Sequence, residues 1–329
     1  MEKPKVRISV RNLVEFILRS GDLDNSRGSS GDKEAMLKGG RLHRKIQRSM
    51  KGNYQAEVSL KRESEYEDVI IQVEGRADGI FTEDGEFWID EIKGTYGNLQ
   101  AMEVPVPVHR AQAMCYGWIY GEKEGLSQIG IQMTYSHLDT EDTRRFREIF
   151  SMEELKNWYQ KLLDDYHKWI SCSLSWKKER NASMKDLQFP FPYREGQREI
   201  VSGVYHTVSS KKTLFVQAPT GVGKTMSAIF PSVRAIGEGK GETLFYLTAK
   251  TITGTVAWEA FHTLRENGLK FKVTAITAKE KLCFLDSPEC TPEKCPYAKG
   301  HFDRVNDAVY ELWTTEEVYS REVIRAHAE

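Results

Sequence analysis

Alternating apolar and polar positions run through the first half of the chain, and a 3.6-residue period replaces the alternation in two places. Alternation is typical of strands with one buried face, and the longer period is typical of amphipathic helices. The pattern predicts a helix over Lys33–Met50, strands over Ala56–Arg62, Val69–Val73, Arg76–Phe81 and Glu86–Ile92, a helix over His109–Tyr120 and a strand over Ile129–Tyr135. This order predicts an α+β domain whose strands form a mostly sequential meander.

The pattern changes at residues 181–192, where a charged stretch gives way to Phe-Pro-Phe-Pro. Two prolines interrupt helix and strand alike, so this stretch is interpreted as a linker between domains over 1–180 and 193–329. The second domain shows strand signals at Thr213–Gln217, Thr243–Leu247 and Phe271–Ile276, alternating with helical stretches. This alternation predicts an α/β domain with a parallel sheet. Because the last residues read as a continuing helix, we expect a truncated domain and a fragment of a longer protein.

Composition narrows the class of protein. The 329 residues exceed one ordinary domain, and 40% apolar with 29% charged residues fits a globular protein without a membrane span or secretion signal. We therefore expect a cytoplasmic protein with no membrane partner. The net charge of −1 means that a nucleic-acid surface requires local clusters of basic residues. The first helix carries such a cluster: Lys38, Arg41, Arg44, Lys45, Arg48 and Lys51.

A phosphate-binding loop occupies residues 218–225, which read Ala-Pro-Thr-Gly-Val-Gly-Lys-Thr. Gly221 and Gly223 let backbone N–H groups turn towards phosphate oxygens, Lys224 supplies a positive charge, and the Thr225 hydroxyl is a ligand for the Mg²⁺ of ATP. The strand signal before the loop and the helix signal after it are the context that this motif requires. We therefore predict ATP binding at these residues.

Two weaker signals flank this loop. Gln197 in Tyr-Arg-Glu-Gly-Gln lies upstream of it, where a side-chain amide can read the adenine edge. The Thr248–Thr251 stretch follows the second strand, where its hydroxyls and lysine can contact single-strand phosphates. An ordinary helix start is the alternative interpretation of both, and it is as good for Thr248–Thr251.

A second candidate site combines Asp78 with Glu91 and Lys93 on the next predicted strand. Alternate residues of a strand share a face, so Glu91 and Lys93 point to the same side. Two carboxylates can hold Mg²⁺ or Mn²⁺ against a scissile phosphate, and a lysine beside them can position the attacking water. A turn at Asp78 and a surface ion pair between the other two are the alternatives.

His43 in Gly-Gly-Arg-Leu-His and the Gln112–Tyr116 pair complete this constellation. Gln112 and Tyr116 are four residues apart and therefore share a helical face. In this order the residues resemble the RecB-type branch of the PD-(D/E)xK nucleases over about residues 33–135. The resemblance implies metal ligation by His43 with both carboxylates, a catalytic lysine, and supporting or DNA-contacting roles for Gln112 and Tyr116.

Three of the five cysteines, Cys283, Cys290 and Cys295, fall close together after the third strand signal of the second domain. Such spacing in a cytosolic protein favours a metal site over disulfides. From about Phe191 the chain resembles the first motor domain of XPD/DinG-type superfamily-two DNA helicases. The resemblance implies a [4Fe–4S] cluster with a fourth ligand beyond Glu329; zinc or free thiols are the alternatives.

Together these features predict an ATP-dependent DNA helicase fused to a metal-dependent DNA nuclease. The expected substrate is single-stranded or branched DNA, and the expected setting is DNA repair or DNA end processing. Two other functions remain open: a DNA-binding clamp that keeps the nuclease fold without its chemistry, and an NTPase with no role on nucleic acid.

Overall fold

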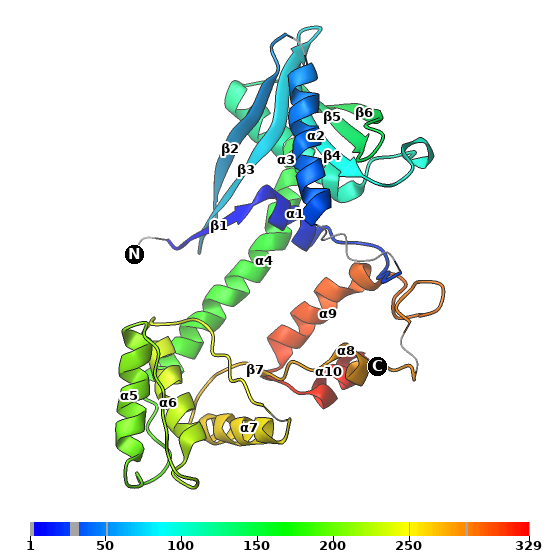
Figure 1. The fold of residues 1–329 in the computed structure, drawn as a ribbon. Coiled ribbons are helices and arrows are strands. Elements are labelled where there is room, and N and C mark those ends of the chain that lie inside the picture. Colours follow the sequence, from blue (N-terminus) through cyan, green and yellow to red (C-terminus); the bar gives the residue numbers. More distant parts are fainter. Residues whose placement is uncertain (1–2, 27–32, 51, 250, 287–288, 329) are drawn as a thin grey trace. The chain divides into compact units, whose positions relative to one another are not determined.

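The computed structural model describes residues 3–26, 33–50, 52–249, 251–286 and 289–328. The chain divides into two compact units: Met1–Ser171 with Leu285–Asp307, and Cys172–Phe284 with Ala308–Glu329. Each is a mixed arrangement of helices and strands (Figure 1). No helix among the described residues has the length and apolar character needed to cross a membrane.

The first unit is built on one mixed sheet. Its strands are β1 (Lys5–Ser9), β2 (Gln55–Glu65), β3 (Ile70–Glu83), β4 (Glu86–Thr95), β5 (Gln128–His137) and β6 (Thr143–Ser151). They follow the order β1-β3-β4-β5-β6, and β2 pairs with the other edge of β3. The β1–β3 and β4–β5 pairs are parallel and the others are antiparallel. The sheet is therefore mixed, and a simple sequential meander is wrong for β4 and β5.

Helices cover this sheet and connect its strands. They are α1 (Val10–Ile17), α2 (Lys33–Ser49), η1 (Leu99–Ala101), α3 (Pro107–Glu124) and α4 (Met152–Lys185). Parallel neighbours require a long crossover, and α3 supplies it between β4 and β5. A proline starts α3, where its missing N–H has no helical acceptor to lose, and Gly125 ends it with φ 68°. A proline and a glycine thus set the two ends of α3, the helix that carries Gln112 and Tyr116.

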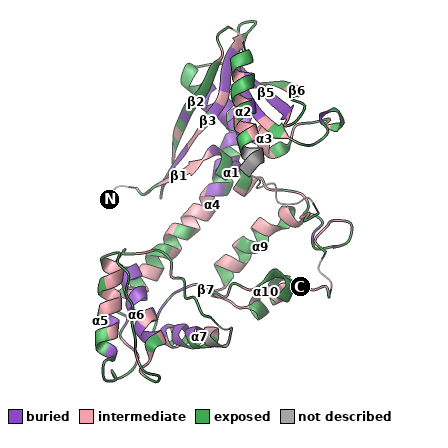
Figure 2. Ribbon diagram, viewed as in Figure 1, coloured by how far each residue is buried: buried purple, intermediate pink, exposed green. Residues whose placement is uncertain are grey.

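The core of this unit lies between the central strands and α3. The strand residues Ile71, Ile89 and Ile129 are fully buried. Leu155 and Leu163 of the helix α4 are also fully buried (Figure 2). Across the sheet, Leu42 and Ile46 of α2 form a small apolar cluster with Ile92 of β4. The strand β4 is therefore covered on both faces, and polar groups on it are removed from water.

The strand signals at residues 69–73 and 76–81 belong to one long strand, β3. Glu74 and Gly75 have low strand propensity, so the sequence pattern breaks there. The strand nevertheless continues through both residues, because β2 pairs with it over nearly its full length. The strands β1 and β6 and the helix α1 were not predicted. The helix α4 runs to Lys185, so residues 181–185 are helical and the linker prediction is wrong there; the prolines begin only at residue 190.

The second unit is mainly helical. It contains α5 (Gln197–Ser209), α6 (Lys224–Gly237), α7 (Thr251–Glu266), α8 (Lys279–Leu282) and α10 (Arg321–Ala328), and α4 and α9 (His301–Thr315) cross its boundary. The strands β7 (Val273–Thr274) and β8 (Val318–Tyr319) pair in parallel. Its apolar core is formed mainly by α6 and α7.

The predicted strands at 213–217 and 243–247 are not strands in the structure. Most of their apolar side chains are exposed, Phe215 by 92% and Leu247 by 89%, whereas Leu244 packs against the core of this unit. A strand is stabilised by its hydrogen-bonded neighbours, and neither stretch has one in the part of the chain that the structure describes. Only the third strand signal yields a strand, the two-residue β7.

Candidate functional site

A fork in the sheet of the first unit creates the site. One edge of β3 pairs with β1 over Ile70–Glu74 and with β4 over Gly79–Glu83. Between these stretches β4 leaves β3 and continues beside β5. Residues 75–78 of β3 therefore face a gap between neighbouring strands, and polar side chains gather there.

Asp78 lies at this fork and links it to α2. Its Oδ2 accepts a 2.7 Å hydrogen bond from the backbone N–H of Ile92, and its Oδ1 lies 3.6 Å from Nδ1 of His43. Gln47, one turn after His43 on α2, donates to the carbonyl oxygen of Asp78 over 2.9 Å. The structure thus brings His43 and Asp78 together, and it adds Gln47, which has no motif that would identify it from the sequence.

Glu91 follows Asp78 around the same fork. Its side chain is 6% exposed, and Oε1 accepts a 2.7 Å hydrogen bond from Nζ of Lys93. Oε2 is buried with no hydrogen-bond partner among the described residues. Burial, then the nearby charge of Asp78, raises the pKa of Glu91 to about 7, while the charges of Lys93 and His43 act in the opposite direction. A buried oxygen without a partner favours a cation or a proton at this position.

The neighbouring Asp90 provides a control within the same strand. Successive strand residues face opposite sides, so Asp90 points away from Glu91. Its carboxylate accepts hydrogen bonds from Thr134 (2.6 Å), Gln132 (3.0 Å) and Tyr54 (3.1 Å). Burial raises the pKa of Asp90 and these donors oppose the rise. Of these two neighbouring carboxylates, Asp90 accepts three hydrogen bonds, whereas Glu91 keeps an oxygen without a hydrogen-bond partner in the described part of the chain.

Tyr116 of α3 lies against this fork, and Gln112 lies one helical turn before it. The Tyr116 hydroxyl lies where a Cβ atom on Gly75 would come within 2.6 Å of it, so a glycine is required at that point of β3. Burial raises the pKa of Tyr116, and the charges of Glu91 and Asp78 add to the rise. Gln112 is buried, and its Oε1 has no partner in the described part of the chain. Tyr116 therefore belongs with the carboxylates, and Gln112 shares a helical face with it.

The donor set suits a hard divalent cation, but it is not gathered into a cage. Two carboxylates and an imidazole are ordinary ligands for Mg²⁺ or Mn²⁺. Within the described ranges, no three His, Cys, Asp or Glu side chains are close enough to hold a metal ion as they stand. Lys93 occupies one oxygen of Glu91 and Ile92 occupies one oxygen of Asp78. The oxygens left over are Oε2 of Glu91 and Oδ1 of Asp78.

The phosphate loop lies in the second unit and ends at the start of α6. Gly221 and Gly223 have φ of 84° and 81°, which favours glycine at both positions. Nζ of Lys224 donates to the carbonyl oxygens of Ala218 (3.1 Å) and Pro219 (2.8 Å). The Thr225 hydroxyl accepts a 3.3 Å hydrogen bond from Tyr246. The loop groups that the motif assigns to phosphate and Mg²⁺ thus contact neighbouring protein atoms.

Gln197 is placed beneath this loop. It is buried, its Oε1 accepts a 3.0 Å hydrogen bond from the backbone N–H of Arg194, and its Nε2 fills the space that a Cβ on Gly223 would need. The Arg194 guanidinium donates to the carbonyl oxygen of Gly221. Gln197 and Arg194 therefore support the loop, a role for Arg194 that the sequence alone did not reveal. Lys250 lies outside the described residues, and α7 begins immediately after it.

The three clustered cysteines are divided by the structure. Cys283 belongs to the second unit, whereas the segment 285–307 with Cys290 and Cys295 groups with the first. Hydrogen bonds anchor this segment to residues 21–25: Asn25 N–H donates to the Cys290 carbonyl (2.8 Å), and Leu23 N–H donates to the Ala298 carbonyl (2.8 Å). The segment 285–307 therefore belongs to the unit that contains the six-stranded sheet, whereas the sequence predicted that it belongs to the second domain.

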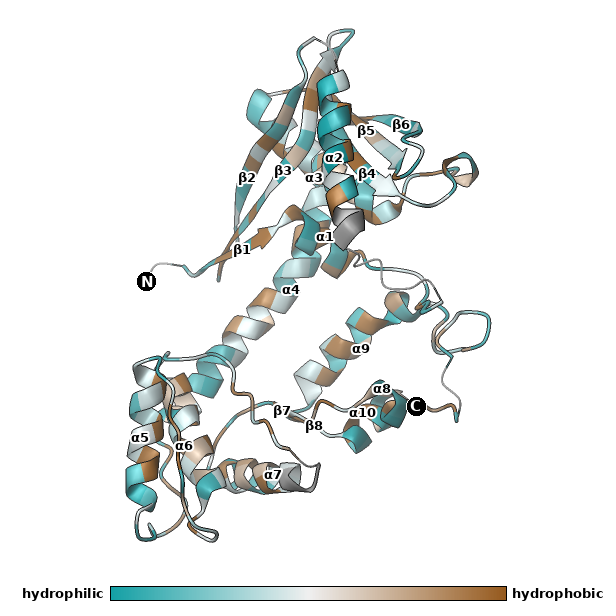
Figure 3. Cartoon of the chain, in the orientation of Figure 1, coloured by the Kyte–Doolittle hydropathy of each residue, from teal (hydrophilic) through white to brown (hydrophobic). Residues whose placement is uncertain are grey.

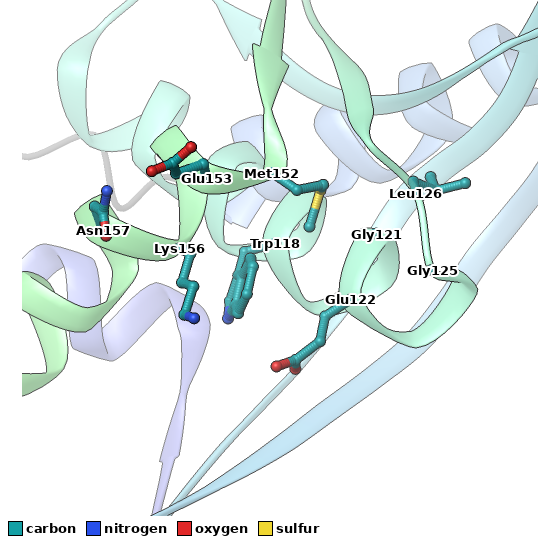
Figure 4. A pocket seen from close by; sticks show the side chains of 9 residues that line it. All are labelled: Trp118, Gly121, Glu122, Gly125, Leu126, Met152, Glu153, Lys156 and Asn157. Atoms are coloured by element: carbon teal, nitrogen blue, oxygen red, sulfur yellow. The ribbon is translucent and has the colours of Figure 1, made fainter.

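A pocket of ≈ 480 Å³ lies between the end of α3 and the start of α4 (Figure 4). None of the residues predicted for the two candidate sites lines it. Its walls are Trp118, Gly121, Glu122, Gly125, Leu126, Met152, Glu153, Lys156 and Asn157. The pocket is thus distinct from the β3–β4 fork.

Comparisons with known proteins include a short match to a helicase. No family model matches the chain. A stretch of 47 residues is 40% identical to "Probable ATP-dependent helicase MJ0942" of Methanocaldococcus jannaschii, covering 14% of this chain and 7% of that relative. The chain is therefore similar to an ATP-dependent helicase over a stretch that spans a small part of the relative's length.

A solved structure described as "Crystal structure of SSO0001" is also similar, at 20% identity and a TM-score of 0.32, over 50% of this chain and 78% of that one. This score is too low for the likeness to carry an argument.

Proposed function

We propose that this chain carries a metal-dependent DNA nuclease site and the nucleotide-binding part of an ATP-dependent DNA helicase. The nuclease proposal depends chiefly on one observation: Glu91 has a buried oxygen without a partner beside Asp78, in a site that also holds Lys93. The helicase proposal is supported by the phosphate loop and by the short similarity to an ATP-dependent helicase. Single-stranded or branched DNA is the proposed substrate, in repair or in end processing.

At the nuclease site, the free oxygens of Asp78 and Glu91 and the imidazole of His43 would hold Mg²⁺ or Mn²⁺. Such an ion, when bound, offsets the charge of the scissile phosphate and acidifies a water. Lys93 holds Oε1 of Glu91 through its 2.7 Å hydrogen bond and fixes the direction of the second oxygen. Its side chain is 24% exposed, so its ammonium group also reaches the solvent side, where a phosphate would lie. Tyr116 and Gln112 form the wall behind the carboxylates.

At the phosphate loop, the backbone N–H groups at the start of α6 and the ammonium group of Lys224 would bind the phosphates of ATP. A helix N-terminus favours anions because its first N–H groups lack partners. Lys224 would exchange two loop carbonyls for phosphate oxygens, and the Thr225 hydroxyl would ligate the accompanying Mg²⁺. Gln197 and Arg194 hold the two glycines that shape the loop.

The iron–sulfur proposal rests on the sequence resemblance. Thiolates are suitable ligands for a [4Fe–4S] cluster. Cys283 belongs to the second unit and Cys290 and Cys295 belong to the first, and no step of the proposed function depends on a cluster.

A DNA clamp without nuclease chemistry is the second candidate function. It is favoured by the same finding that no three metal-binding side chains are gathered at the fork in the described part of the chain. Metal binding that depends on Asp78 and Glu91 would distinguish the two functions, because a clamp has no use for the buried oxygen of Glu91.

Cleavage of DNA tests the nuclease proposal directly. The purified chain is incubated with end-labelled single- and double-stranded DNA, with Mg²⁺ or Mn²⁺ and without ATP. We expect metal-dependent cutting that falls by about 100-fold or more in Glu91→Gln and in Lys93→Ala, since each removes a group that acts on the reacting phosphate or water.

Glu63→Gln is the matched control, because it removes a carboxylate of the same sheet that pairs with Lys5 on the surface. The control should cut at the rate of the unchanged chain. A folded chain that binds DNA but does not cut it under any metal condition would replace the nuclease by the clamp.

A further inference from the structure

The helix α2 presents three different sides. Successive helical residues are about 100° apart, so residues three, four and seven apart lie in one stripe. Leu42 and Ile46 face the sheet, where they pack on Ile92. His43 and Gln47 face the fork, where they contact Asp78. The remaining side is hydrophilic and turned to solvent (Figure 3).

Two lysines on this remaining side are paired within the protein. Nζ of Lys38 lies 3.1 Å from Oδ1 of Asp139, and Lys45 forms an ion pair with Glu141. Both acids belong to the turn between β5 and β6. These two lysines therefore attach α2 to the sheet, and part of the positive charge of the helix is neutralised there.

Three arginines remain: Arg41, Arg44 and Arg48. They are exposed, and none forms an ion pair with another residue in the described ranges. Their spacing of three and four residues places them in one stripe about 10 Å long. Like charges at this spacing repel one another and destabilise the helix. A polyanion along the stripe would reverse this effect.

The stripe also borders the site. Arg44 directly follows His43, and Arg48 directly follows Gln47, so each arginine lies one helical step from a residue that contacts Asp78. Guanidinium groups bind phosphate oxygens through two parallel hydrogen bonds and carry no preference for a base. The arrangement therefore fits the backbone of a nucleic acid that passes the β3–β4 fork.

We propose that Arg41, Arg44 and Arg48 form a phosphate-binding stripe that holds DNA, without sequence preference, alongside the Asp78–Glu91 site. This proposal rests on the proposed function for the identity of the polyanion. It excludes Lys38 and Lys45 from the contact, because both are already paired with acids of the first unit.

Salt dependence of DNA binding tests the stripe. The affinity of the full chain for a fluorescently labelled DNA duplex is measured by anisotropy in EDTA, over a series of KCl concentrations. The variant is the triple change Arg41→Gln, Arg44→Gln and Arg48→Gln, and its matched control is the double change Lys38→Gln and Lys45→Gln. Thermal unfolding of both variants confirms that each is folded.

Each phosphate contact contributes about 0.9 to the slope of log affinity against log salt on a duplex. We expect the triple change to reduce the size of this slope by about 2–3, and we expect the control to reduce it by less than about 0.9, the value of one contact. An unchanged slope in the triple variant, an equal loss in the control, or no DNA binding by the unchanged chain would overturn the stripe. EDTA prevents metal-dependent cutting, so this measurement reports binding alone. A reduced slope in the triple variant, together with no cutting by the unchanged chain in the Mg²⁺ or Mn²⁺ assay, would support the stripe and reject the nuclease.

Discussion

The two candidate sites differ in how far their surroundings are formed. At the fork of the first unit, strands on both sides and helices on both faces bury the carboxylates, and burial raises the pKa of Glu91 to about 7. At the phosphate loop, the flanking stretches at 213–217 and 243–247 have no strand partners among the described residues, and Lys224 contacts carbonyl oxygens of its own loop.

This difference shows that two kinds of site depend on different levels of structure. The phosphate loop depends mainly on residues that are adjacent in the sequence: two glycines, a lysine and a helix start form it, and Gln197 and Arg194 support it. The carboxylate site requires long-range pairing, because Asp78 and Glu91 meet only when β3 and β4 separate between their neighbours.

Core substitutions should affect the two regions unequally. Ile89 is fully buried beside Glu91, and Ile89→Ala removes packed methyl groups, so we expect a loss of about 2–5 kcal/mol in the free energy of unfolding of the first unit. Phe215 is 92% exposed, and Phe215→Ala should change stability by less than about 0.5 kcal/mol. Hydrogen exchange of the β4 and α6 amides measures both. Comparable losses in the two variants would show that the 213–217 stretch is packed in solution.

The two sites should be separable by mutation. Lys224→Ala removes the charge for the outer phosphates, so ATP affinity should fall by about 100-fold or more, which corresponds to about 3 kcal/mol. Metal-dependent cutting without ATP should be unchanged, because the fork contains no residue of the loop. Calorimetric titration with ATP measures the affinity, and Lys240→Ala, an exposed lysine after α6, is the control. Loss of cutting in Lys224→Ala would refute the independence of the sites.

The buried carboxylate should also give a pH signature. Because the pKa of Glu91 rises from 4.5 to about 7 on folding, the folded chain holds this proton where the unfolded chain has lost it. The contribution of Glu91 to the free energy of unfolding is fully present below pH 4.5. It is lost as the pH rises through about 7, and the loss is at most about 3 kcal/mol. Thermal unfolding is measured without metal between pH 5 and pH 8.5. The stability of Glu91→Gln relative to the unchanged chain should increase towards pH 8.5. A constant difference between the two would contradict the buried environment.

The sequence predicted most elements of the first unit because their hydrophobic periods agree with their environments. Its errors have particular causes. The strand β3 was divided in two at Glu74 and Gly75, where pairing with β2 overrides weak propensity. The stretch 213–217 is rich in strand-forming residues, yet it pairs with no strand within the described ranges, and a local sequence pattern cannot predict whether a pairing strand lies beside it.

The candidate site shows the same division. Spacing selected the motif residues His43, Asp78, Glu91, Lys93, Gln112 and Tyr116. Contacts in the structure connect all of them except Gln112 around the fork. Gln47, Arg194 and the satisfied state of Asp90 were not predictable, because each depends on contacts between residues far apart in the sequence. The order of motifs thus predicts the members of a site, whereas its supporting contacts require the fold.

The most direct test of the central claim is Mn²⁺ binding to the metal-free chain, followed by calorimetry or by the loss of the free Mn²⁺ spectrum. We predict one site whose affinity falls by about tenfold or more in Asp78→Asn and in Glu91→Gln, while Asp90→Asn, if folded, retains it, because Asp90 points to the opposite face of β4. Equal Mn²⁺ affinity in the unchanged chain and in the Asp78→Asn and Glu91→Gln variants would contradict a metal-dependent nuclease site at this fork.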